Sequence, residues 1–228
     1  AIAQRLNVDG CFVVAIDIDE VQGDKLVTEI GPECCAFFKC DISDESAVQQ
    51  LFKTVIKRFH RIDILVNNAG IIRDNMIWKM SSEDFDSVLN INLKGPWLLC
   101  REAAVIMKLQ NSGRIINISS RAWLGNRGQS NYSSSKAGLI ALTRVLALEL
   151  GSYGVLVNAV APGLIDTPLT KKLPDEVQQK LLAAQPTGKM GTPANVAHAV
   201  SFLASEETQF ITGQTIYVDG GKSIGASM

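Results

Sequence analysis

Two side chains with complementary proton chemistry, Tyr132 and Lys136, lie four residues apart in the segment SNYSSSKAGLIALTRVLALEL. Four residues is just over one helical turn, so a helix would place the phenol and the ammonium on one face. A free tyrosine has a pKa of about 10, and a nearby cation lowers it by favouring the phenolate. Ser119 and Ser120 lie upstream, and a serine hydroxyl could hydrogen-bond a substrate carbonyl or alcohol oxygen. Together these groups predict proton transfer to or from an oxygen while a hydride moves elsewhere.

The surroundings of this group decide its interpretation, because a Tyr-x-x-x-Lys spacing is by itself common by chance. Strand-like apolar segments accompany it, namely Ile62–Gly70 (IDILVNNAG), Gly113–Ser120 (GRIINISS), Gly154–Gly163 (GVLVNAVAPG) and Ile211–Gly221 (ITGQTIYVDGG). In this order these elements resemble the short-chain dehydrogenase/reductase family over essentially the whole chain. The resemblance is closest to the 3-oxoacyl-(acyl carrier protein) reductase-like group, through NNAGIIRDN, GNRGQSNYSSSKAG and the tail FITGQTIYVDGG.

The composition predicts a single domain over residues 1–228, since no repeat, low-complexity tract or linker divides the 228 residues. Apolar residues make up 46%, and no apolar run is long enough to cross a bilayer. A net charge of −1 offers no general attraction to nucleic acid or to a membrane surface. The five cysteines form no C-x-x-C pair, so buried thiols in a reducing cytoplasm are expected. The two histidines have no ligand-like neighbours, so no metal site is expected.

Strand-like runs alternate with helix-period segments along the chain, which is the pattern of an α/β protein. We expect a Rossmann-type doubly wound parallel sheet with helices on both faces, as the resemblance also implies. Helices are expected over Glu20–Ile30, about 44–59, about 82–109 with a bend at Gly95-Pro96, and from Tyr132 to about Leu150. Two more helices are expected to begin at Pro174 and, with Thr192 as cap, at Pro193.

One element of such a sheet is missing from the sequence. A doubly wound nucleotide-binding sheet opens with a strand and a glycine-rich turn that cradles pyrophosphate at a helix N-terminus. The segment AIAQRLNVDG instead reads as the remainder of the first helix. Because the missing strand lies in the middle of the sheet, its loss would leave two strands without partners. We expect the natural protein to carry about two dozen further N-terminal residues; the alternative is a degenerate relative unable to hold pyrophosphate, and the coenzyme predictions depend on the first explanation.

Asp17 ends the first strand-like run, in VVAIDIDE, where the family places the residue that selects its coenzyme. A carboxylate there accepts hydrogen bonds from the adenosine ribose hydroxyls and repels the extra phosphate of NADP. The resemblance therefore implies NAD(H) in preference to NADP(H), with Asp19 as a second candidate for this role. The alternative is a strand-end aspartate that is merely solvated.

Other residues match family positions that contact the coenzyme. The resemblance places Asp41 at the adenine amino group, with Ile42 beside the ring. It places Asn67, Ala69 and Gly70 under the adenosine ribose, and it brings Pro162, Gly163, Ile165 and Thr167 to the nicotinamide carboxamide. A structural role stays open for the Asn-Asn-Ala-Gly turn and for Thr167, which could cap the following turn.

The resemblance makes Tyr132 the general acid and base, and it makes Lys136 both the depressor of its pKa and a ligand of the coenzyme ribose. Asn92, in NINLKG, matches the asparagine that holds a water between Lys136 and solvent; the alternative is a polar residue that interrupts an apolar helix. Ser120 aligns with the oxyanion-polarising serine if the strand end stays in register, whereas counting back from the tyrosine selects Ser119. Side chains alternate along a strand, so only one serine faces the substrate, and Ser120 is our prediction.

The expected function is reversible hydride transfer between NAD(H) and a ketone or secondary alcohol, in the manner of a 3-oxoacyl-thioester reductase. Residues 169–184 are expected to close over a pocket lined by Ile72, Trp123, Leu124 and Leu164, although Trp123 and Leu124 could simply be core. The alternatives are an oxidative dehydrogenase of small or cyclic secondary alcohols and a non-catalytic NAD-binding scaffold. An acidic carrier-protein partner would meet the basic residues Arg121, Arg127, Lys171 and Lys172. The LALEL helix and the ITGQTIYVDGG strand resemble the family's oligomer contacts, which implies a homotetramer.

Overall fold

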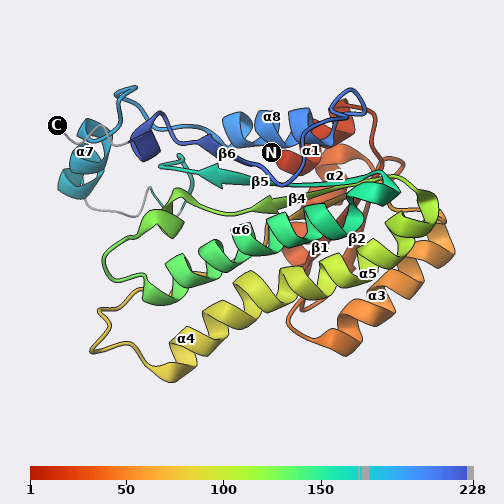
Figure 1. Ribbon diagram of the computed structural model, residues 1–228, viewed down its shortest axis with the longest axis horizontal. Coiled ribbons are helices and arrows are strands. Elements are labelled where there is room, and N and C mark those ends of the chain that lie inside the picture. Colours follow the sequence, from red (N-terminus) through yellow and green to blue (C-terminus); the bar gives the residue numbers. More distant parts are fainter. Residues whose placement is uncertain (169, 171–174, 225–228) are drawn as a thin grey trace.

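The computed structural model describes residues 1–168, 170 and 175–224, in which parallel strands alternate with helices (Figure 1). The strands are β1 (Val13–Asp17), β2 (Cys35–Lys39), β3 (Ile64–Asn67), β4 (Gly113–Ile118), β5 (Val155–Pro162) and β6 (Thr215–Val218). The helices are α1 (Ile2–Val8), α2 (Glu20–Ile30), α3 (Glu45–Phe59), α4 (Ser82–Leu89), α5 (Gly95–Gln110), α6 (Ser130–Leu150), α7 (Asp175–Ala183) and α8 (Pro193–Ala204). The predicted α/β class is therefore confirmed, and in the described part of the chain no helix combines the length and hydropathy that a membrane span requires.

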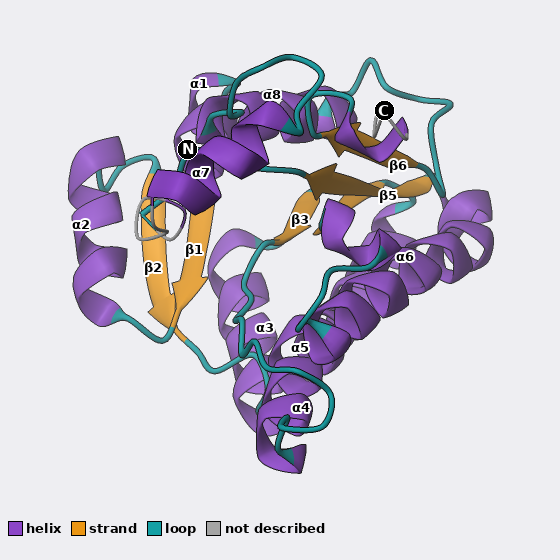
Figure 2. Ribbon diagram, turned by 90° about the vertical axis from the view of Figure 1, so that its left-hand side faces the viewer, coloured by secondary structure: helices purple, strands orange, loops and turns teal. Residues whose placement is uncertain are grey.

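Helices cover both faces of the strands, and each face has its own apolar core (Figure 2). On one face, Leu98 and Met107 of α5 pack with Ile115 of β4. On the other face, Val200 of α8 packs with Ile116 of β4, and α1 lies beside α8. Adjacent residues of β4 thus serve opposite cores, because strand side chains alternate between faces. Both faces of β4 are buried, which explains its nearly continuous apolar sequence.

The strands form two parallel sheets rather than one. β1 pairs with β2, and the second sheet has the order β3-β4-β5-β6. Figure 2 shows β1 and β2 standing apart from the other strands. Among the described residues, β1 pairs only with β2 and β3 pairs only with β4, so β1 and β3 each have one edge without a partner strand.

Polar side chains fix where several helices begin. Asp44 accepts hydrogen bonds from two backbone N–H groups in the first turn of α3. Thr192 and Asn195 form a reciprocal capping box before α8, and Pro193 occupies the first turn, as predicted. A side-chain cap of this kind contributes about 1 kcal/mol to helix stability. The helix start predicted at Pro174 lies outside the described residues.

The long helix predicted over residues 82–109 contains one irregular turn. α4 ends at Leu89, Asn90–Lys94 form a π-helical turn, and α5 continues to Gln110. The N–H of Gly95 donates to the carbonyl of Asn90, one residue further back than in an α-helix. Pro96 has no N–H, so the normal ladder is already interrupted at this point. We predicted a bend at Gly95-Pro96, and the structure shows a widened turn immediately before it.

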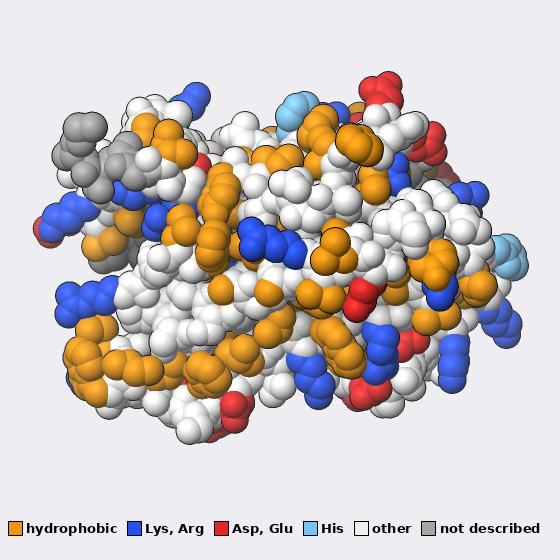
Figure 3. All heavy atoms as spheres, viewed as in Figure 1, with side chains coloured by type: hydrophobic (Ala, Val, Ile, Leu, Met, Phe, Trp, Pro, Cys, Tyr) orange, Lys and Arg blue, Asp and Glu red, His pale blue; other side chains and the backbone are white. Residues whose placement is uncertain are grey.

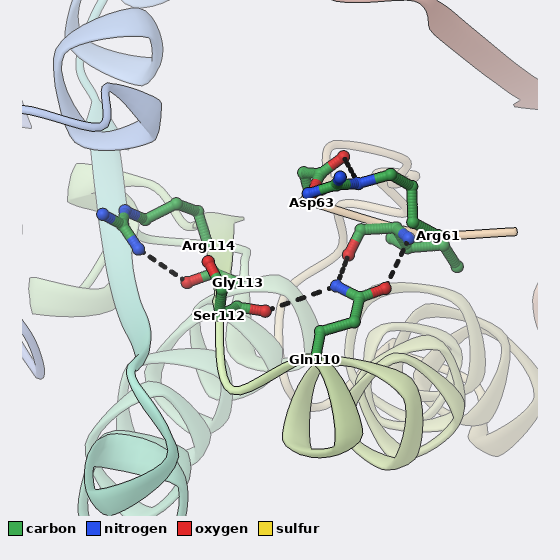
Figure 4. Close-up of polar contacts among 7 residues, drawn as sticks. Arg61, Asp63, Gln110, Ser112, Gly113 and Arg114 are labelled. Carbon is green, nitrogen blue, oxygen red and sulfur yellow. Dashed lines mark hydrogen bonds and ion pairs between the residues drawn. The ribbon is translucent and has the colours of Figure 1, made fainter. Parts of the chain in front are cut away.

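The amino ends of β3 and β4 are held by a polar cluster, at the end of the sheet remote from the carboxyl ends (Figure 4). Gln110, the last residue of α5, accepts a hydrogen bond from the N–H of Ile62 at 3.0 Å and donates to its carbonyl at 2.8 Å. Arg61 and Asp63 form an ion pair at 2.6 Å. Because both of these charged side chains are exposed, the pair adds little stability, and Gln110 is the residue that joins α5 to the start of β3.

Substitution of Gly154 tests the turn that leads into β5. Gly154 has a φ of 69°, and a Cβ at this position would lie 2.7 Å from the carbonyl oxygen of Asn111. Gly154→Ala therefore combines left-handed strain with a main-chain clash, and we expect it to lower the free energy of unfolding by about 2 kcal/mol or more. Urea unfolding measures this loss.

Gly151→Ala is the matched control for this substitution. Gly151 has a φ of −57°, and no atom lies within 4 Å of the position its Cβ would take. We expect this variant to change the unfolding free energy by less than about 0.5 kcal/mol. Equal losses in the two variants would contradict the assignment of strain to Gly154.

Candidate active site

A cavity of about 480 Å³ opens at the carboxyl ends of β4 and β5, where open parallel sheets bind their ligands. The loop after β3, the end of β4, the first turns of α6 and the end of β5 form its walls. The lining residues are Asn68, Gly70, Ile71, Ile72, Arg73, Ile118, Ser119, Ser120, Tyr132, Lys136, Pro162 and Gly163. The fold thus gathers predicted catalytic, coenzyme and substrate residues from distant parts of the sequence.

Lys136 is held in the wall of this cavity with 4% of its surface exposed. Its Nζ donates a hydrogen bond to the carbonyl of Ile118, the last residue of β4, at 2.8 Å. The same Nζ lies 5.7 Å from the centroid of the Tyr132 ring, so the two side chains share one face of α6 as their spacing predicts. Burial lowers the pKa of Lys136 to about 8, because the ammonium loses its water shell here.

The pKa of Tyr132 shifts in the direction opposite to the one expected from the sequence. Burial raises the pKa of Tyr132, a hydrogen bond with the Ser120 side chain opposes this rise, and the charge of Asp74 adds to it. The sequence predicted a lowered pKa on account of Lys136, and this prediction is wrong for the structure described. The reason is that the phenol is withdrawn from water while the Lys136 ammonium is directed at the carbonyl of Ile118. Tyr132 is therefore a protonated phenol at neutral pH, which suits a proton donor.

The two serines after β4 point in different directions. Ser119 is buried, and its Oγ donates to the carbonyl of Lys136 at 3.0 Å, so it ties β4 to α6. Ser120 lines the cavity with Tyr132, and its side chain is the one that opposes the rise of the Tyr132 pKa. Its Oγ also accepts a hydrogen bond from the N–H of Ala122 at 3.1 Å. The geometry therefore places Ser120, and not Ser119, beside the phenol.

Asn92 lies in the π-helical turn and is fully buried. Its Oδ1 accepts from the N–H of Ile71 at 2.8 Å, and its Nδ2 donates to the carbonyl of Ile71 at 2.9 Å and to Ser135 Oγ at 3.3 Å. The amide thus clamps the loop that follows β3. π-Helical turns often occur at functional sites, and here the turn points a helix side chain at this loop.

The predicted adenosine-side carboxylates lie on the surface. Asp17 ends β1 and is exposed, and its Oδ1 accepts from the N–H of Asp19 at 3.1 Å. Asp19 accepts from the N–H of Gln22 at 3.1 Å and so caps α2. Asp41 is exposed after β2, and its Oδ1 accepts from both the N–H and the hydroxyl of Ser43.

Two other residues predicted to contact the coenzyme are buried in the protein interior. Ile42 is 8% exposed and belongs to the core on the α5 face. Asn67 is 4% exposed, and its Nδ2 donates to Asn117 Oδ1 at 2.8 Å and to Cys100 Sγ at 3.1 Å. Its Oδ1 has no hydrogen-bond partner among the described residues. Asn67 thus has the structural role that the sequence left open, while one acceptor remains unsatisfied.

The remaining predicted coenzyme residues lie in two loops. Ala69 is exposed beside Gly70 in the loop after β3. Ile165 is 9% exposed and joins the core on the α8 face. The N–H of Thr167 donates to Thr170 Oγ1 at 2.8 Å, so Thr167 takes part in a local turn.

The residues predicted to line the substrate pocket have different positions. Ile72 lines the cavity. Trp123 donates from Nε1 to the hydroxyl of Tyr217 at 2.7 Å and so joins the loop after β4 to β6. Leu124 is 47% exposed, and the carbonyl of Leu164 accepts from the N–H of Gly191 at 2.9 Å. Leu169, Lys171 and Lys172 lie outside the described residues.

Asn131 is a buried residue that the sequence analysis did not single out. It is fully buried, its Oδ1 accepts from the N–H of Tyr132 at 2.7 Å, and its Nδ2 donates to the carbonyl of Arg73 at 2.8 Å. Beside it, Gln129 Nε2 donates to Asp74 Oδ2 at 2.9 Å. These hydrogen bonds hold the loop after β3 against the start of α6. The available signal was an amide residue directly before Tyr132, since such side chains bond to nearby main chain at helix starts.

Comparison with known proteins places this geometry among dehydrogenases and reductases. A family model described as enoyl-(acyl carrier protein) reductase matches residues 1–223. The (2S)-[(R)-hydroxy(phenyl)methyl]succinyl-CoA dehydrogenase subunit BbsD of Thauera aromatica is 46% identical, over 97% of this chain and 90% of that protein. The 3-oxoacyl-[acyl-carrier-protein] reductase FabG of Thermotoga maritima is 41% identical, over 93% and 88%. The (3R)-3-hydroxyacyl-CoA dehydrogenase of Rattus norvegicus is 42% identical, over 97% and 90%.

The buried ammonium predicts a pH dependence of stability. The pKa of Lys136 is about 8 in the folded chain and 10.5 as its ordinary value, so the unfolded chain binds more protons between these limits. The free-energy cost of the buried charge is therefore present in full below pH 8 and disappears as the pH rises to 10.5. Relative to Lys136→Met, the wild-type chain should gain about 3 kcal/mol of unfolding free energy over this window. Urea unfolding of both proteins between pH 7 and 10.5 measures the difference.

Lys53→Met on α3 is the matched control, because that side chain is exposed. The difference between the wild-type chain and this control should stay constant with pH. A constant difference for Lys136→Met as well would show that the Lys136 ammonium is not desolvated in the folded protein.

Proposed function

The chain belongs to the short-chain dehydrogenase/reductase family and is an oxidoreductase that acts on hydroxyl or keto groups, and we propose that its substrate is a 3-oxoacyl or 3-hydroxyacyl thioester. The proposed reaction is reversible hydride transfer between NAD(H) and the carbon that carries the keto or hydroxyl oxygen. The convergence of Ser120, Tyr132 and Lys136 on one cavity carries this proposal. The relatives named above support the thioester, because each name contains CoA or acyl carrier protein.

The residues around the cavity fit a nicotinamide coenzyme. A Cβ on Gly70 would lie 3.2 Å from Asn92 Oδ1 and 3.5 Å from Lys136 Nζ, so glycine keeps this wall open. Gly163 also lines the cavity, and a Cβ there would lie 2.6 Å from the Cβ of Asp219, so glycine allows the end of β5 to pack against the residue that follows β6. Lys136 and Gly163 would hold the nicotinamide half of the coenzyme, and Gly70 would lie under the adenosine ribose. When bound, the coenzyme supplies or accepts the hydride.

Asp17 supports a preference for NAD(H) over NADP(H). Its carboxylate is exposed at the carboxyl end of β1, where it can accept hydrogen bonds from ribose hydroxyls. A 2′-phosphate at the same place would meet a like charge. Asp19 is the weaker candidate because its carboxylate already caps α2.

The proton chemistry follows from the described contacts. In the reductive direction, the protonated phenol of Tyr132 donates its proton to the keto oxygen as that oxygen gains negative charge. The hydroxyl of Ser120 donates a hydrogen bond to the same oxygen and stabilises the charge. Lys136, whose Nζ lies 5.7 Å from the ring centroid, would bind the coenzyme ribose beside the phenol. In the oxidative direction the phenolate takes the proton from the substrate hydroxyl.

The other candidate functions have less support. A small or cyclic secondary alcohol would react at the same Tyr132, but the relatives are named for thioesters. A non-catalytic scaffold would not require Ser120, Tyr132 and Lys136 to meet in one cavity. Arg121 and Arg127 remain candidates for contact with an acidic carrier protein.

The proposal includes a homotetramer in the cytoplasm. Exposed apolar side chains lie on the segments that resemble oligomer contacts, namely Val145 and Leu148 on α6 and Phe210 before β6. Apolar surface of this kind is typical of subunit interfaces. All five cysteines are free thiols, in keeping with a reducing compartment.

Tyr132→Phe tests the proposed reaction. We expect the variant to bind coenzyme but to reduce acetoacetyl-CoA with a kcat at least about 100-fold below that of the wild-type chain, because the proton donor is removed. The measurement is coenzyme oxidation at saturating NADH, followed spectroscopically. Tyr153→Phe is the matched control, since that ring lies under Lys108 and away from the cavity. Undiminished turnover in Tyr132→Phe would refute the proposal.

Asp17→Ala tests the coenzyme preference. We expect the ratio of kcat/KM for NADH to that for NADPH to fall at least about tenfold, since the repelling carboxylate is removed. Asp19→Ala is made in parallel and should leave the ratio unchanged. A fall in the Asp19 variant alone would transfer the role to that residue, and no fall in either variant would contradict carboxylate selection.

A further inference from the structure

A second cavity, of about 390 Å³, lies next to the candidate active site. Residues 75–78 of the loop before α4, residues 125–129 of the loop after β4, and the first turn of α6 form its walls. Figure 3 shows hydrophobic side chains gathered over the loop before α4, at the end of the molecule where the strands have their carboxyl ends. The two cavities therefore open at the same end of the sheet.

The loop after β3, and the stretch from the end of β4 to the first turns of α6, form walls of both cavities. Arg73 lines the catalytic cavity, and Asn75 lines the second one. Between the cavities, the N–H of Asn75 donates to the carbonyl of Gly128 at 2.9 Å, and Gln129 donates to Asp74 at 2.9 Å. A substrate held at Tyr132 that extends past Arg73 would therefore cross these two hydrogen bonds and reach the second cavity.

The lining of the second cavity combines apolar, neutral polar and cationic groups. Ile77 and Trp78 are 68% and 70% exposed and form an apolar ledge. Ser134 lines the cavity with an exposed side chain, which carries a hydroxyl. Arg127 is the only charged residue in the described lining, and it forms no ion pair with any described residue. The cavity thus offers apolar contact, an exposed hydroxyl and one positive charge.

We propose that this cavity binds the pantetheine arm of the thioester substrate, an inference that rests on the proposed function. The arm carries amide groups and a geminal dimethyl group, and in both CoA and carrier proteins it ends in a phosphate. The apolar ledge of Ile77 and Trp78 takes the methyl groups, and the hydroxyl of Ser134 bonds an amide. Arg127 meets the phosphate at the outer end of the arm.

The composition of the lining excludes simpler occupants. A small ketone fits within the catalytic cavity and would make no contact with the second cavity. An acyl chain would leave Arg127 without an anion and would offer no polar group to Ser134. A neutral, amide-rich arm that ends in negative charge satisfies each of these groups.

The test compares thioesters that share one reacting end but differ in the arm: acetoacetyl-CoA, acetoacetyl-pantetheine and the truncated acetoacetyl-N-acetylcysteamine. Trp78→Ala should raise KM about tenfold for the first two, and leave kcat for all three and KM for the truncated thioester unchanged. Arg127→Ala should raise KM for the CoA thioester alone, because pantetheine lacks the phosphate. An acetoacetyl-carrier protein should show the same loss with Trp78→Ala, and a KM below that of CoA would identify the carrier protein as the source of the arm.

Phe202→Ala, which removes an exposed aromatic ring of α8 that lines neither cavity, is the matched control and should change none of these constants. Ile77→Ala provides a second variant of the ledge if Trp78→Ala fails to fold. If Trp78→Ala changed KM equally for all three thioesters, or for none of them, the inference would be overturned. Turnover of these thioesters by the wild-type chain would still support the proposed function. Failure of the wild-type chain to reduce any thioester would instead remove the proposed function and this inference together.

Discussion

A positive charge buried beside a phenol is the constraint on which the rest of the site depends. An ammonium that leaves water is destabilising by several kcal/mol unless polar groups surround it, and Lys136 meets the carbonyl of Ile118. Since Ile118 ends β4, this hydrogen bond forms only if α6 passes the end of the strand with Lys136 level with Ile118. The hydrogen bond from Ser119 Oγ to the carbonyl of Lys136 holds α6 and β4 in the same relative position. The packing of helix on sheet and the placing of the reactive groups therefore share their contacts.

Buried amides extend this control to the other walls of the site. Asn67 and Asn117 are cross-strand neighbours on β3 and β4, and Asn117 Nδ2 donates to Thr143 Oγ1 of α6 at 2.8 Å. Asn92 holds the loop beyond β3 from the opposite helix, and Asn131 holds it from α6. Because unpaired polar groups are costly in an interior, these side chains tolerate few alternative arrangements. They give the cavity fixed walls even though loops form much of it.

Local pattern was sufficient to predict most of the fold and the face that carries Tyr132 and Lys136. Alternating apolar runs and helix caps are properties of neighbouring residues, so α2, α3, α6 and α8 lie close to where the sequence places them. The pKa direction of Tyr132 could not be predicted, because it depends on burial and on Asp74 from another segment. Likewise, the partner of Trp123 is Tyr217, which only tertiary packing brings near. Long-range contacts of this kind leave no trace in local spacing.

The π-helical turn at Asn90–Lys94 also sets the phase between α4 and α5. Its wider hydrogen-bonded ring holds one residue more than an α-helical turn, which rotates everything downstream by about 100°. Deleting a single residue there would keep a continuous helix yet swing Leu98 and Met107 away from the sheet. The number of residues in this turn therefore matters to the packing of α5 as much as the identity of Asn92 matters to the loop after β3.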